Sequence, residues 1–303
     1  MRTGRCTGAF MTAAQLAWDC QCELGEGALW NAPDQSLYFV DIKGCVVLAW
    51  TPSCAAQRRW PMPQMAGWLV PRRAGGWLAG LAQGPVALQL GAQGAVQVEW
   101  LHRLHRPDSP LRLNDAKVDA RGRLWFGSMN HLDETQPQGL LYRWEAGSDP
   151  VVVDAGYGVT NGPAFSPDGR TLYHTDSLAR TVYAFDLSDD GVLSRKRAWL
   201  RLDDDEGFPD GMTTDADGCL WIAHWGASRV TQRDATGRIL RTVALPVAQV
   251  TNVAFGGPQL RDLFITTART GMDAAALAAA PLAGALFVAP DVGQGTAAHA
   301  FAG

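Results

Sequence analysis

Three segments of the chain share one pattern, in which a polar residue is followed eight positions later by a turn glycine and then by an apolar strand core. The pattern pairs Asn114 with Gly122, Asn161 with Gly169, and Asp210 with Gly218. A repeat that places a polar side chain at one structural position in every copy gathers those side chains around a common axis. The pattern therefore predicts a toroidal repeat protein with a polar cluster on its axis.

Similar strand cores, each preceded by a turn, recur about 40 to 48 residues apart along the whole chain. Their first residues are Leu37, Trp77, Leu124, Leu172, Leu220 and Leu263. A unit of this length accommodates four short strands, as in a propeller blade. We therefore predict an all-β fold, a six-bladed β-propeller over residues 15–303, preceded by a flexible extension of residues 1–14. Residues 15–22 are expected to close the ring as the outer strand of the last blade.

Charge and cysteine content narrow the choice of partners and compartment. The net charge is -4 and no block of Lys or Arg stands out, so neither nucleic acid nor a membrane is expected as a partner. The six cysteines lack metal-binding spacing, which favours reduced thiols and a cytoplasmic location. The beginning of the chain lacks the apolar core of a signal peptide, and Met11 is an alternative start. The oligomeric state stays open.

Five of the six repeats place an oxygen-bearing side chain at one corresponding position. These residues are Glu26, Asn114, Asn161, Asp210 and Asn252. Asn and Asp form turns readily, which could explain each of them singly. However, a separate turn follows each one, and Glu26 is not a turn former. Because the innermost strand of a blade lines the channel, the set predicts a shared site at one mouth of that channel.

The donor types in this set indicate a hard divalent cation. Carboxylate and amide oxygens suit Ca²⁺, Mg²⁺ or Mn²⁺, with Fe²⁺ and Zn²⁺ also open. Glu26 and Asp210 supply two negative charges, which match a dication. Arg112 lies two residues before Asn114 and so faces the same way on an extended strand. It could hydrogen-bond the oxygens of a substrate, or it could form a surface salt bridge.

Six segments of the chain resemble the senescence marker protein/gluconolactonase family, which includes regucalcin and bacterial sugar-acid lactonases: 24–30, 112–119, 127–129, 160–163, 173–176 and 208–211. The resemblance implies one divalent cation, with Ca²⁺ favoured, bound by Glu26, Asn161 and Asp210. It also implies that Asp210 is the catalytic base and that Arg112 and Asn114 contact the substrate. The repeat alignment adds Asn252 as a further substrate contact. Some relatives carry an acidic substrate contact just after the 127–129 stretch, where this chain has Asn130, His131 and Leu132, with Asp133 and Glu134 just beyond.

The resemblance implies an enzyme, a metal-dependent lactonase that opens a pentono- or hexonolactone to the aldonic acid. The cation would polarise the lactone carbonyl while Asp210 accepts a proton from the attacking water. Two other functions stay open at this point. Similar six-bladed calcium propellers hydrolyse organophosphates and aryl esters, and a calcium-binding propeller need not be an enzyme. The sugar and the native metal are likewise open.

Overall fold

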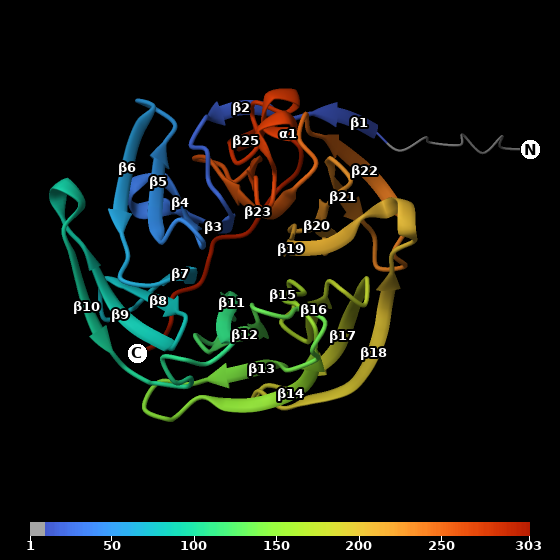
Figure 1. The fold of residues 1–303 in the computed structure, drawn as a ribbon. Coiled ribbons are helices and arrows are strands. Elements are labelled where there is room, and N and C mark those ends of the chain that lie inside the picture. The colour runs from blue at the N-terminus through green and yellow to red at the C-terminus, as the bar shows by residue number, and fades with distance from the viewer. Residues whose placement is uncertain (1–9) are drawn as a thin grey trace, which may run out of the picture.

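The computed structural model describes residues 10–303, which form six antiparallel sheets around a central channel (Figure 1). Blade one contains β3 (Gly25–Asn31), β4 (Ser36–Asp41), β5 (Val46–Thr51) and β6 (Ala56–Pro61). Blade two contains β7 (Ala66–Pro71), β8 (Trp77–Leu81), β9 (Gly84–Leu90) and β10 (Val96–Trp100). Blade three contains β11 (Leu111–Val118), β12 (Leu124–Asn130), β13 (Gly139–Trp144) and β14 (Val151–Tyr157). The predicted all-β, six-bladed propeller is confirmed.

The other three blades repeat this order from the channel outward. Blade four contains β15 (Thr160–Phe165), β16 (Thr171–Asp176), β17 (Thr181–Leu187) and β18 (Leu193–Arg201). Blade five contains β19 (Phe208–Thr214), β20 (Leu220–Trp225), β21 (Arg229–Arg233) and β22 (Ile239–Ala244). Blade six contains β23 (Val250–Gly256), β24 (Asp262–Thr267), β25 (Leu286–Ala289) and β2 (Gln15–Trp18). Short helices connect some strands: η1 (Ala32–Asp34), η2 (Ala92–Gly94), η3 (Asp204–Glu206) and α1 (Ala274–Ala279).

The N-terminal segment closes the ring. β2 pairs antiparallel with β25, so the first part of the chain supplies the outer strand of the last blade, as predicted. The extension expected over residues 1–14 is shorter in the structure, because Phe10–Ala13 forms β1 and pairs in parallel with β22 of blade five. Residues 1–9 lie outside the described part of the chain. Each added strand covers a sheet edge that would otherwise expose unpaired backbone groups.

The repeated turns have a common backbone geometry that explains the glycine in the sequence pattern. Gly122 and Gly218 have φ angles of +84° and +82°, in the left-handed region that favours glycine. In both turns an aspartate three residues earlier accepts hydrogen bonds from the turn. Asp119 also accepts from Trp125 Nε1 at 2.9 Å, which ties the turn to the strand core that follows. The glycine in the sequence pattern therefore reflects the conformation of the turn as well as the repeat.

A C-terminal strap, residues 291–303, crosses the end of the channel at which these turns lie. It is the red segment that runs through the centre of Figure 1 toward β7 and β8. At one end of the strap Ala216 N donates to Gln294 O at 2.7 Å, and at the other Ala302 N donates to Gly122 O at 3.0 Å. The strap therefore links blade five with blade three across the ring.

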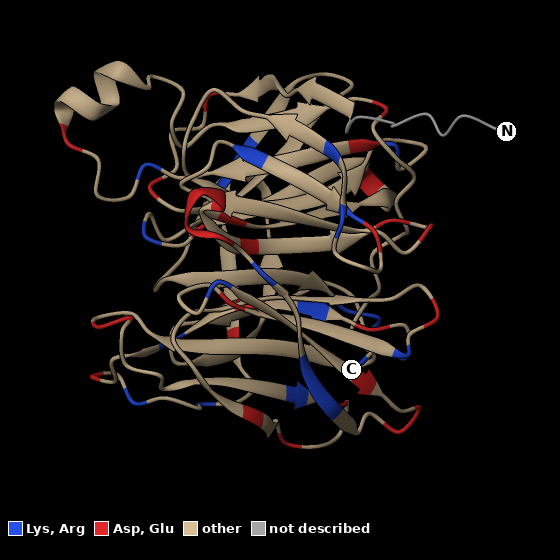
Figure 2. Ribbon diagram, turned by 90° about the vertical axis from the view of Figure 1, so that its right-hand side faces the viewer, with Lys and Arg blue, Asp and Glu red and all other residues tan. Residues whose placement is uncertain are grey.

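The surface charge and the length of the helices relate to the prediction that neither nucleic acid nor a membrane is a partner. Both signs of charge are interspersed along the loops and outer strands on the side that Figure 2 presents, where α1 projects from the body of the molecule. Within residues 10–303, the structure contains no helix that is long and apolar enough to cross a membrane.

The strap should contribute measurably to stability through Phe301. This side chain is 2% exposed, and its ring lies 4.6 Å from that of Trp144 in blade three. We expect Phe301→Ala to lower the free energy of unfolding by about 3 kcal/mol, the usual loss for a buried aromatic side chain. Urea denaturation followed by tryptophan fluorescence measures the change. Phe10→Ala is the control, since Phe10 is 67% exposed and should cost less than about 0.5 kcal/mol. Equal stability of Phe301→Ala and the wild type would mean that the strap does not hold the ring.

Candidate active site

Each innermost strand changes its pairing register next to the polar residue of its repeat. The shifts lie between Glu26 and Leu29, Leu113 and Ala116, Asn161 and Ala164, Pro209 and Met212, and Val250 and Asn252. A bulge adds a residue to one strand and re-aims the side chains beside it. The same local irregularity therefore recurs in five blades at the residue expected to face the channel. β7 of blade two has it as well, between Ala66 and Trp68, without a polar residue.

The structure buries all of the predicted site residues. Glu26, Asn114, Asn161, Asp210 and Asn252 are between 2% and 6% exposed, and Arg112 is 5% exposed. One chain of hydrogen bonds joins blades three and four. Arg112 Nη1 donates to Asn114 Oδ1 at 2.6 Å, and Asn114 Nδ2 donates to Asn161 Oδ1 at 2.9 Å. Asn161 Nδ2 in turn donates to Ser177 Oγ at 2.9 Å.

A second group of hydrogen bonds crosses the channel. Asn252 Nδ2 donates to Glu26 Oε2 at 3.1 Å and to Asp115 Oδ2 at 3.2 Å. Asn252 belongs to blade six and Asp115 to blade three, which lie opposite each other in a ring of six. Asp115 also accepts from the backbone N–H of Gly162 at 3.1 Å. These bonds form a floor beneath the mouth of the channel.

Asp115 is a site residue that the repeat alignment missed. It follows Asn114 directly, and neighbours on a regular strand point to opposite sides. The bulge between Leu113 and Ala116 instead turns both side chains toward the channel. An alignment that assigns one channel-facing residue to each blade has no place for a second one. The signal was nevertheless present, as a further carboxylate within the 112–119 segment.

Three buried carboxyl groups on the axis have raised pKa values, and burial is the main cause in each case. Burial is the main cause for Glu26, whose pKa rises to about 8 with a further contribution from the charge of Asp115. Burial also raises the pKa of Asp115 to about 6. The pKa of Asp210 lies well above its usual range, because of burial and then of repulsion by Glu26 and Asp115. Burial lowers the pKa of Arg112 to about 10, against the opposing effect of nearby carboxylates.

These residues fit a divalent cation. With all groups ionised, three carboxylates and one guanidinium carry two excess negative charges, which a dication balances. Asp210 Oδ1 is buried and has no hydrogen-bond partner within the described region. Glu26 and Asn161 contribute further hard oxygen donors to the same cluster. No group of three or more His, Cys, Asp or Glu suited to a metal occurs within residues 10–303, so a cation here would rely on the amide of Asn161.

The loop after β12 brings charged groups toward Arg112. Burial lowers the pKa of Arg112, and the charge of Glu134 is among the effects that oppose this shift. Burial, and then the charge of Arg112, lowers the pKa of His131. Asp133 is exposed and accepts hydrogen bonds from Thr135 and Gln136. Of the two acidic residues in this loop, Glu134 is therefore the one that acts on Arg112.

Comparison with known proteins places the chain in a family. The family model described as SMP-30/Gluconolactonase/LRE-like region matches residues 24–269, and the chain belongs to this family. It is 36% identical to regucalcin of Danio rerio, over 89% of this chain and 92% of that protein. It is 32% identical to a pentonolactonase of Haloferax volcanii, over 85% of this chain and 86% of that protein. The predicted resemblance is confirmed.

A solved structure supports the fold. The calcium-binding protein regucalcin of Agrobacterium tumefaciens superimposes with a TM-score of 0.90 at 23% identity, covering 96% of this chain and 98% of that chain. At this identity the likeness shows the fold alone.

The cross-channel bonds of Asn252 should stabilise the protein. Asn252→Leu removes the amide that bridges Glu26 and Asp115, so each of these buried carboxylates loses one of its hydrogen bonds. We expect a loss of about 1–3 kcal/mol in the free energy of unfolding, measured by urea denaturation. Asn31→Leu is the control, because Asn31 donates to Asp34 at an exposed site, and it should change stability by about 0.5 kcal/mol or less. Equal effects of the two substitutions would contradict a special role for Asn252.

Proposed function

We propose that the protein hydrolyses a sugar lactone to the aldonic acid with the aid of one divalent cation. The observation that carries this proposal is the buried Asp210 carboxyl, which has an unpartnered oxygen and lies in a carboxylate cluster with Glu26. Family membership supports it, because a relative that is 32% identical is named a pentonolactonase. A structure that maintains buried, mutually repelling carboxylates on its axis suits a site that takes up positive charge.

Glu26, Asn161 and Asp210 would hold the cation, which supplies a Lewis acid for the lactone carbonyl when bound. Ca²⁺ is our first choice, and Mg²⁺, Mn²⁺, Fe²⁺ and Zn²⁺ are alternatives for the same donors. Asp210 is the general base, and it takes a proton from the water that attacks the carbonyl carbon. As the ring C–O bond breaks, the same proton passes to the ring oxygen. The products are the carboxylic acid and the new hydroxyl group.

Arg112 and Asn114 would orient the sugar. Arg112 Nη1 is fixed by Asn114 Oδ1 and by the backbone oxygen of Leu113 at 3.0 Å, so the guanidinium has a defined position before a substrate arrives. Its other N–H groups suit the oxygens of a hydroxylated lactone. Asn252 was expected to contact substrate, but its amide hydrogens are engaged by Glu26 and Asp115. We therefore assign Asn252 the role of positioning Glu26.

A second candidate is cation binding without catalysis, because a relative that is 36% identical is named regucalcin. It uses the same donors and predicts the same cation dependence of stability, but no turnover. Aryl-ester hydrolysis is less suited to this site, because an aryl ester would leave the buried polar donors of Arg112 and Asn114 unpaired.

Cation binding is tested on protein treated with a chelator. Restoring Ca²⁺, Mg²⁺, Mn²⁺, Zn²⁺ or Fe²⁺ in turn should raise the melting temperature, and a cation at about 100 times its Kd adds about 2.7 kcal/mol. Asp210→Asn and Glu26→Gln should abolish this increase. Asp205→Asn, at an exposed position, should retain it. An unchanged melting temperature with all five cations would rule out the proposed site.

Catalysis is tested with a substrate panel on the cation-loaded protein. Xylono-, arabino-, galactono- and gluconolactone are compared with paraoxon and phenyl acetate in a pH-stat assay. We expect turnover of at least one sugar lactone and a loss of about 10²–10⁴-fold in kcat for Asp210→Asn. Faster turnover of the aryl substrates, or full activity of Asp210→Asn, would contradict the assignment. Cation binding without any turnover would favour the second candidate.

A further inference from the structure

The channel contains a separate cavity at the end opposite the candidate active site. The cavity has a volume of about 570 Å³. Asp115 and Asn252 line it, so the floor formed by their hydrogen bond is also its inner wall. Residues 296–299 of the C-terminal strap lie over its outer end. This rear cavity has the size of ordinary small-molecule sites, which span about 300–1,000 Å³.

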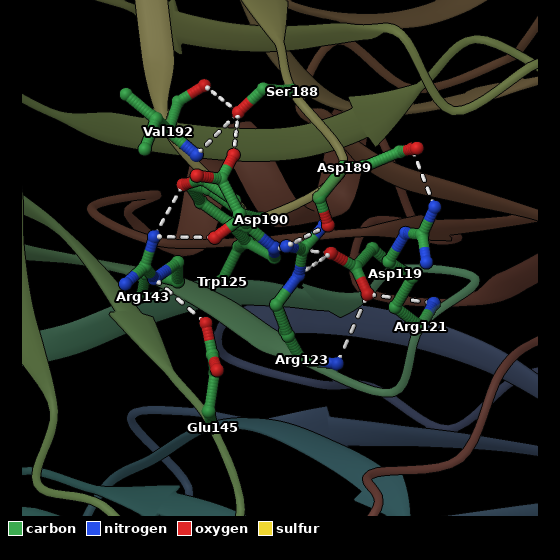
Figure 3. Close-up of polar contacts among 11 residues, drawn as sticks. Asp119, Arg121, Arg123, Trp125, Arg143, Glu145, Ser188, Asp189, Asp190 and Val192 are labelled. Carbon is green, nitrogen blue, oxygen red and sulfur yellow. Dashed lines mark hydrogen bonds and ion pairs between the residues drawn. The ribbon is translucent and has the colours of Figure 1, made fainter.

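Two of the three carboxylates at the outer rim of the rear cavity have cationic partners, and the third, Asp168, is exposed to solvent. Asp119 forms an ion pair with Arg123 Nε at 2.7 Å, and Asp189 forms one with Arg121 Nη2 at 2.5 Å (Figure 3). Figure 3 also shows Ser188 and Asp190 beside the residues of these two ion pairs. The charges of these two ion pairs cancel locally, which leaves the inner part of the cavity to determine the charge of a ligand.

Lys117 is the cation of that inner part. Its Nζ donates to the backbone oxygen of Met212 at 3.2 Å, and within the described region no carboxylate lies within ion-pair distance of it. An ammonium group has three N–H donors, so two remain available. Protein surrounds the side chain, yet Lys117 keeps accessible surface and lines the cavity. That surface therefore faces the cavity.

The charge of Asp115 compensates the charge of Lys117 only in part. Asp115 acts on Lys117 through its charge. Its oxygens, however, already accept from Ala116 N at 2.7 Å, from Gly162 N and from Asn252. The Asp115 charge also disfavours a ligand that carries two negative charges. The lining of the cavity also includes the small apolar side chains of Ala28, Ala164 and Ala254.

We propose that the rear cavity binds a small organic monocarboxylate. The carboxylate of the ligand accepts hydrogen bonds from the free N–H groups of Lys117, and its short aliphatic part lies against Ala28, Ala164 and Ala254. The strap covers the bound molecule from the solvent side. This site is distinct from the proposed lactone site, because the floor of Asp115 and Asn252 lies between them.

Butanoate is the probe, titrated into the full-length protein by isothermal calorimetry, with butanamide as the uncharged ligand of the same shape. Butanoate should bind and butanamide should bind at least tenfold more weakly. Lys117→Met, which keeps the length of the side chain, should weaken butanoate at least tenfold, as expected for loss of a hydrogen bond to a charged group. Arg121→Gln, at the paired cation of the rim, should change affinity less than twofold. Arg112→Met alters the proposed lactone site and should also change the affinity for butanoate less than twofold.

A second measurement does not depend on how Lys117→Met folds. In ¹⁵N-labelled wild-type protein, butanoate should shift the backbone amide signals of Ala297 and Ala298 in the strap. Absence of butanoate binding, an effect of Arg112→Met in place of Lys117→Met, or shifts confined to residues around Asp210 would each overturn the proposal.

Discussion

The hydrogen bonds from Asn252 to Glu26 and Asp115 hold together a cluster that would otherwise repel itself. A six-bladed ring converges on its axis, so any acidic residue at the head of an inner strand meets the acidic residues of other blades in a buried space. Burial raises the pKa of Glu26, Asp115 and Asp210, and repulsion by neighbouring carboxylates adds to it for Glu26 and Asp210. Removing a buried polar partner from such a cluster is costly. The amide of Asn252 therefore stabilises an arrangement that a bound cation would complete.

The sequence was enough to predict the blades and the position of most candidate site residues, because both depend on local structure that recurs in each blade. A bulge in the inner strand and a turn after that strand recur with the repeat, so alignment alone locates Glu26, Asn161 and Asp210 at equivalent places. Asp115 was not predicted, because the direction of its side chain depends on the bulge itself. The strap was not predicted either, since residues 291–303 carry no strand periodicity and are positioned by contacts with distant blades.

Two closures of different kinds hold the ring. β2 pairs antiparallel with β25, which joins the first part of the chain to the last blade. The strap instead spans the ring on one face, anchored by single hydrogen bonds and by the buried Phe301. The first closure holds blade one against blade six, whereas the strap links blade five with blade three.

The strand β11 connects the two ends of the channel. Arg112 faces the channel before the bulge, Asn114 and Asp115 do so within it, and Lys117 lines the cavity after it. The bulge thus changes which residues of the alternating strand face inward. Without it, Lys117 would point into the blade, where a buried ammonium without a counter-ion is unfavourable. The bulge in β11 therefore brings Asp115 to the candidate active site and Lys117 to the rear cavity. Both ends of the channel follow from the same insertion of one residue into the ladder.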